Sequence, residues 1–153
     1  MKSSAAGVRM ESAGVRWQPC SADDITEVAR AHRLSSLPHT YESWLRKHGR
    51  GPAGGSTFHR QGGVAYLPDA LDNPKIAQEI IEGLSTPFRL PPRALVVSTW
   101  QGYMFEFVCC DDGVDPELRT FIEGEPSSGR THGHRLLSDY LQVLVQTEVT
   151  DPG

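Results

Sequence analysis

Apolar residues recur every three or four positions in two segments near the start of the chain, which is the spacing of one helical face. The first segment predicts a helix from about Ser21 to Arg33, because the Ser21 side chain suits an N-cap. The second predicts a helix that starts near Pro38 and ends at Gly49, where a glycine can supply a left-handed C-cap. The predicted inward positions are Ile25, Val28, Ala29, Tyr41, Trp44 and Leu45.

A third helical segment follows a short strand candidate at Val64–Leu67. We predict Asn73 as the cap of this helix, Pro74 as its first residue and Gly83 near its end. Prolines at positions 87, 91 and 92 then predict an irregular link.

After this link the pattern changes from helical spacing to alternation. Ala94–Thr99 predicts a buried strand, and Gln101-Gly102 predicts a turn. Tyr103–Cys110 alternates with the period of a second strand, and Leu118–Glu123 predicts a third. The polar stretch Gly124–Gly133 predicts a mobile connection. The second half of the chain is therefore predicted to form an antiparallel meander.

A last apolar stripe predicts a closing helix. Its members are Leu136, Leu137, Tyr140, Leu141, Leu144 and Val145. Helices first, a meander next and a closing helix favour an α+β fold. At 153 residues the chain fits one domain. We expect a flexible N-terminal tail over residues 1–18 and a single domain over residues 19–153.

The composition of the chain indicates in which cellular compartment the protein works. No apolar run approaches the roughly 20 residues of a membrane span, and the first 14 residues lack the apolar core of a secretory signal. The three cysteines, Cys20, Cys109 and Cys110, are an odd number with two adjacent members, which disfavours a disulfide framework. These features favour a cytoplasmic protein.

Charge is distributed unevenly along the chain. Residues 1–99 carry 12 Lys and Arg against 9 Asp and Glu, whereas residues 100–153 carry 3 against 10. An acidic half suits a basic protein partner better than nucleic acid. The predicted partner-binding residues are Trp100, Tyr103, Asp111, Asp112, Asp115, Glu117, Glu123 and Glu125. A solubilising rim and a calcium site are the alternatives for these carboxylates.

Other combinations of residues do not point to catalysis. His132 and His134 form a His-x-His pair in a polar loop, and two histidines are too few ligands for a zinc site. Cys109 and Cys110 run into two aspartates, which disfavour a reactive thiolate. No nucleophile and base occur at a credible spacing. We therefore predict neither an enzyme nor a bound cofactor or metal.

Four segments, in this order, carry a recognisable pattern: a Leu-Pro, aromatic, Leu, Gly helix, a glycine–aromatic strand, an acidic turn and the start of a final helix. They are Leu37–Gly49, Gly102–Phe107, Asp111–Pro116 and Ser138–Leu141. Together they resemble the SUKH superfamily over about residues 20–148. Leu137 stands where the family usually has Phe, and Leu118-Arg119 stands where it has Val-Tyr.

The resemblance implies a function in protein binding. Many bacterial SUKH members are immunity proteins that neutralise a toxin, often a nuclease, without a shared catalytic apparatus. The resemblance thus implies an immunity protein that binds a toxin, and it implies binding more firmly than any one partner. From the acidic second half of the chain we expect a basic toxin domain as partner, with no direct binding to nucleic acid or membrane. Some eukaryotic relatives regulate cell-wall synthesis through protein contacts, so a regulatory module with a non-toxin partner is the alternative.

Overall fold

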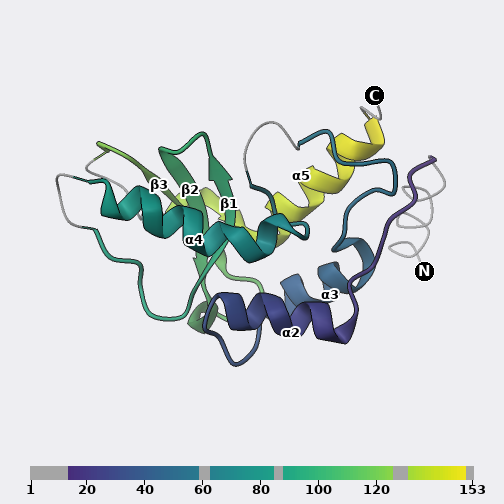
Figure 1. The fold of residues 1–153 in the computed structure, drawn as a ribbon, viewed down its shortest axis with the longest axis horizontal. Coiled ribbons are helices and arrows are strands. Elements are labelled where there is room, and N and C mark those ends of the chain that lie inside the picture. Colours follow the sequence, from purple (N-terminus) through teal and green to yellow (C-terminus); the bar gives the residue numbers. More distant parts are fainter. Residues whose placement is uncertain (1–13, 59–62, 85–87, 126–130, 151–153) are drawn as a thin grey trace.

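The computed structural model describes residues 14–58, 63–84, 88–125 and 131–150, with the backbone only at residues 131–134. Three helices precede a sheet, and a fourth helix follows it (Figure 1). Their bounds are α2 Ala22–Ala31, α3 His39–His48, α4 Asp69–Glu82, β1 Ala94–Trp100, β2 Met104–Cys109, β3 Glu117–Ile122, β4 Thr131–Leu136 and α5 Leu137–Thr150. A short 3-10 turn, η1, spans Cys110–Asp112.

The four strands form an antiparallel meander in the order β1-β2-β3-β4, which confirms the predicted α+β class. Helix α4 lies across one face of the sheet (Figure 1), where Ala77 and Ile80 share a core cluster with Phe105, Phe107 and Phe121. The other face belongs to a second cluster formed with α2, α3 and α5. That cluster includes Leu95, Val97 and Val108 of the sheet with Leu137, Leu141 and Leu144 of α5.

The first helix forms as predicted, because Ser21 and Asp24 make a reciprocal capping box. The Ser21 hydroxyl accepts from the Asp24 backbone N–H, and the Asp24 carboxylate accepts from the Ser21 N–H. Arg50 also donates to Asp24 at 2.7 Å, which ties the end of α3 to the start of α2.

The prediction of a left-handed cap at Gly49 was wrong. Gly49 closes α3 in the right-handed region, with φ −59° and ψ −28°. Glycine is required at this position because a Cβ there would collide with the Cys20 sulfur and the Leu45 carbonyl oxygen. The tight approach of the chain before α2 to the end of α3 thus depends on the missing side chain.

Replacing Gly49 by alanine is expected to lower the free energy of unfolding by about 1–3 kcal/mol, the usual cost of overpacking. Gly54→Ala is the matched control, because a Cβ at Gly54 meets nothing within 4 Å. Urea denaturation of both variants measures the difference. Equal, negligible losses would contradict the packing argument.

The start of α4 also differs from the prediction. The helix begins at Asp69, so Asn73 is inside it and fully buried, and Val64–Leu67 forms an irregular turn in place of a strand. The Asn73 side-chain amide donates to the Val64 carbonyl at 3.0 Å. Asn73 therefore satisfies a backbone carbonyl of the preceding turn from within the helix. Asn73-Pro74 looks like a helix start in sequence, but α4 starts one turn earlier, at Asp69.

The β1–β2 hairpin forms at the predicted turn, with both Gln101 (φ 45°) and Gly102 (φ 80°) in the left-handed region. This pair of positive angles is typical of a type I′ turn, whose twist matches that of the flanking strands.

Strand β4 corrects two further predictions. Thr131–Gly133, assigned to a mobile connection, lies in β4, and Leu136 ends that strand with 36% of its side chain exposed instead of joining the α5 stripe. Pairing with β3 supplies the backbone hydrogen bonds that hold this polar segment in the sheet.

The domain extends slightly into the predicted tail. Gln18 exchanges backbone hydrogen bonds with Arg50 and Gly51, and Trp17 packs against the main core. Residues 1–13 lie outside the described part of the chain.

Candidate protein-binding surface

The predicted acidic residues fall at two opposite ends of the sheet. Glu117 begins β3, whereas Glu123 follows its last residue. Glu117 and Glu123 are six positions apart, which along an extended strand is about 20 Å at roughly 3.3 Å per residue. Screening at physiological salt acts over about 8 Å, so charges at the two ends do not reinforce each other.

The aspartates at the first end are already engaged within the fold. Asp111 pairs with Arg93 at 2.7 Å, and Asp112 pairs with Arg119 at 3.3 Å. Asp115 accepts from the Ser138 backbone N–H at 2.9 Å and from its hydroxyl at 2.6 Å. Asp115 therefore anchors the start of α5, and of the four carboxylates at this end Asp111 and Asp112 are paired with arginines.

The opposite end of the sheet carries four of the predicted residues, and we call this end the hairpin-end surface: Trp100, Tyr103, Glu123 and Glu125. The Glu123 backbone N–H donates to the Tyr103 carbonyl at 2.9 Å, which holds the exit of β3 against the hairpin turn. Tyr103 is 40% exposed, and both glutamates are exposed. Neither glutamate forms an ion pair within the described residues.

Glu106, which sequence reasoning did not single out, borders this surface on the α5 side of β2. In β2, Glu106 points to the same face of the sheet as Met104 and Val108. The alternation of the sequence is enough to predict this shared face. The Ser98 hydroxyl donates to Glu106 Oε1 at 2.9 Å, while Oε2 lies 3.9 Å from Arg135 Nη1. The Glu106 side chain is only 15% exposed and lines a small pocket of ≈ 150 Å³ together with Trp100.

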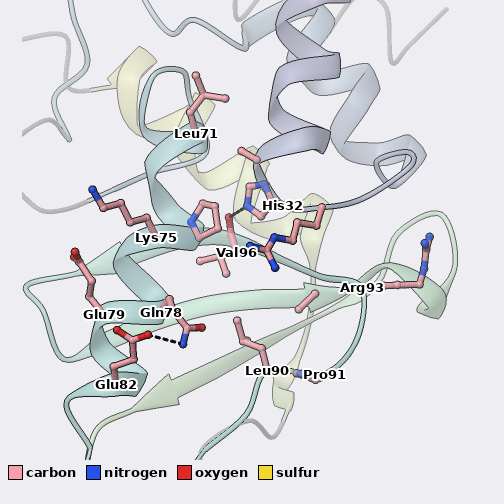
Figure 2. Close-up of a pocket in the computed structure, with 14 residues that line it drawn as sticks. His32, Leu71, Lys75, Gln78, Glu79, Glu82, Leu90, Pro91, Arg93 and Val96 are labelled. Atoms are coloured by element: carbon pink, nitrogen blue, oxygen red, sulfur yellow. Dashed lines mark hydrogen bonds between the residues drawn. The ribbon is translucent and has the colours of Figure 1, made fainter.

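A larger open groove of ≈ 1060 Å³ lies on another side of the domain, between the end of α2, helix α4 and the lead-in to β1. Figure 2 shows Gln78 and Glu82 joined by a hydrogen bond along α4, with Leu90 beside them and Val96 near His32. Arg93 turns away from the groove and pairs with Asp111. The other charged side chains that line the groove are Arg33, which follows α2, and Lys75, Glu79 and Glu82 along α4. None of these four forms an ion pair within the described residues.

His32 lies buried at the inner end of this groove (Figure 2). Its Nδ1 is 2.9 Å from the Val28 carbonyl oxygen, and its Nε2 is 3.2 Å from that of Val96. Val96 adjoins a bulge in β1, which turns its carbonyl toward α2. A neutral imidazole has one N–H and satisfies only one of the two carbonyls. Burial nevertheless lowers the His32 pKa, against the smaller raising effect of the two carbonyls.

This lowered pKa predicts a loss of stability in mild acid. The unfolded chain binds the proton at the ordinary value of 6.5, above the folded pKa, so the stability contributed by neutral His32 is present above that pH and is lost as the pH falls below it. Thermal melts from pH 8 to about pH 5 should show a smaller acid loss for His32→Asn than for wild type. His39→Asn, an exposed histidine on α3, serves as control. Identical pH slopes for wild type and His32→Asn would contradict this account.

The three cysteines are free. Burial raises the pKa of Cys110 to about 11, with Arg93 opposing and Asp111 reinforcing the shift, and burial also raises the pKa of Cys109. Cys109 ends β2, whereas Cys110 belongs to η1 and is only half-buried. Both thiols are therefore poor nucleophiles near neutral pH.

Within the described residues no group of three or more His, Cys, Asp or Glu side chains is arranged to hold a metal ion. The side chains of His132 and His134 lie outside the described part of the structure. None of the described helices is long and apolar enough to span a membrane.

Comparisons of the chain with protein-family models, with curated proteins and with solved structures found no match.

Proposed function

We propose that the chain is an immunity-type protein of the SUKH kind, which binds a basic toxin domain in the cytoplasm and blocks its active site. The four sequence segments that resemble this superfamily support the proposal, as does the α+β arrangement of helices around a meander. The observation that carries it is the hairpin-end surface, where Tyr103 is exposed and bonded through its backbone to Glu123. Glu123 and Glu125 are also exposed there and have no ion-pair partner in the described part of the chain.

This surface has the composition of a contact for a positively charged protein. Aromatic anchors beside polar groups are where binding energy concentrates. Carboxylates that are exposed and not neutralised by the fold attract a basic partner over a distance. A nuclease suits this role, because the basic cleft with which it binds phosphate would then be occupied and its substrate excluded. Inhibition by this route requires no chemistry from the immunity protein.

Growth rescue tests this proposal. The open reading frame beside the gene for this chain is expressed in a heterologous bacterium, with and without the chain. We expect that the neighbouring product arrests growth alone, that co-expression restores growth, and that the two proteins copurify at one to one. A harmless neighbour that still copurifies with the chain would favour the regulatory alternative. A toxic neighbour that the chain neither binds nor neutralises would contradict the proposal.

A further inference from the structure

The pocket beside Glu106 has the size of one side chain. Its volume of ≈ 150 Å³ equals that of about five waters in the liquid, at about 30 Å³ each. Pockets that hold small-molecule ligands usually enclose about 300–1,000 Å³. Its walls are mostly apolar and come from three parts of the fold. They include Phe58, Trp100, Met104, Tyr140 and Leu144, with Glu106 as the charged member.

The Glu106 carboxylate is only partly satisfied within the described structure. Oε1 accepts the Ser98 hydroxyl, but the 3.9 Å from Oε2 to Arg135 Nη1 exceeds a hydrogen bond, and no other described group reaches Oε2. Arg135 itself is 41% exposed, so this ion pair is loose and well hydrated. The Glu106 charge also raises the pKa of Tyr140, although burial of that phenol is the larger cause. A carboxylate in mostly apolar surroundings with one oxygen unused favours a cation beside it.

We propose that this pocket receives a single arginine side chain of the partner protein, with its guanidinium against Glu106 Oε2. This inference rests on the proposed function and names the chemistry of the partner residue. An arginine fits best because its planar guanidinium donates to a carboxylate, stacks on aromatic rings and loses hydration more readily than an ammonium group. Trp100 joins the two sites, since it lines the pocket and also belongs to the hairpin-end surface. Arg135 acts as a weak competitor at the rim.

Titration with N-acetyl-L-arginine amide, followed by ¹H–¹⁵N correlation spectra, tests the pocket without knowledge of the toxin. We expect saturable shifts of the Trp100 indole N–H and of the Met104 and Glu106 amides at millimolar affinity. N-acetyl-citrulline amide, a neutral analogue of similar shape, should leave these signals in place. Glu106→Gln should weaken binding of the arginine probe about tenfold or more. Gln keeps the acceptor for Ser98, so the fold should survive the change.

Glu123→Gln is the matched control, because it removes the same charge from the neighbouring surface but not from the pocket. It should leave the affinity for the arginine probe unchanged, while Arg135→Ala should increase it. Equal affinities for wild type and Glu106→Gln, equal shifts with the citrulline probe, or no saturation in wild type would each overturn the inference. A toxin bound equally well by wild type and Glu106→Gln would overturn the pocket alone. Saturable binding of the probe by a chain that neutralises no toxin would overturn the proposed function alone.

Discussion

Replacing Leu141 by alanine is expected to lower the free energy of unfolding by about 2–5 kcal/mol, the range for a buried leucine. Leu141 is 2% exposed and lies in the middle of α5, within the core cluster that this helix shares with the sheet and with α2 and α3. Truncation removes apolar area from that cluster and leaves a cavity that close-packed neighbours fill only in part. Docking of α5 against the rest of the domain is the packing that the variant weakens.

Val143→Ala is the control within the same helix, since Val143 is 48% exposed. It should change the free energy of unfolding by no more than about 0.5 kcal/mol. Chemical denaturation of the two variants measures both values. A loss for Leu141→Ala as small as that of the control would show that α5 does not dock.

Reversing Glu123 and Glu125 to lysine is expected to slow association with the toxin domain by about tenfold or more at low salt, because steering by a complementary field raises association rates by about 10–10³. Both carboxylates are exposed and without an ion pair in the described part of the structure, so the melting temperature should change little. Stopped-flow association at two ionic strengths measures the effect. Added salt should slow the wild type and hardly affect the variant.

Reversing Asp111 and Asp112 to lysine provides the same change in formal charge at the other end of the sheet. That end lies about 20 Å from the hairpin-end surface, more than two screening lengths, so we expect a much smaller effect on the association rate. Losing the pairs with Arg93 and Arg119 should also cost some stability. Equal slowing by both double variants would show that net charge, not the hairpin-end surface, controls binding.

Strand β2 and helix α5 could be predicted from the sequence because local pattern and tertiary packing agree there. The alternation after the Gln101-Gly102 turn predicted β2, and the stripe from Leu137 to Val145 predicted the buried face of α5. In β2 the apolar residues follow the period of a strand, and in α5 they follow the period of a helix. In each segment one register therefore buries nearly all of the apolar residues.

The errors lie where long-range contacts decide. Asn73-Pro74 has the sequence of a helix start, yet Asn73 is buried to bind the Val64 carbonyl, a partner that local sequence does not reveal. The polar segment at Thr131 becomes a strand only because β3 lies beside it. Gly49 is required by the nearby Cys20 sulfur, which belongs to a distant part of the chain.

Only part of the candidate binding surface could be predicted, again because contacts between distant segments decide which residues are exposed and unpaired. The acidic residues stood close together in sequence, but an extended strand divides them between two ends. At one end, Arg93 and Arg119 pair with Asp111 and Asp112. Tyr103 lies in the turn between β1 and β2, so its nearness to Glu123 at the end of β3 follows from the meander. The pocket at Glu106 depends on Phe58 and on α5, which no local pattern connects with β2.

The most direct test of the account is a titration of the purified toxin domain with the purified chain, followed through the toxin's own enzymatic activity. Neutralisation by occlusion predicts a linear fall in activity that reaches zero at one equivalent, and recovery of unmodified, active toxin when the complex is dissociated. Complete inactivation by a small fraction of an equivalent would show catalysis in place of binding. Full toxin activity in the presence of excess chain would contradict the proposed function.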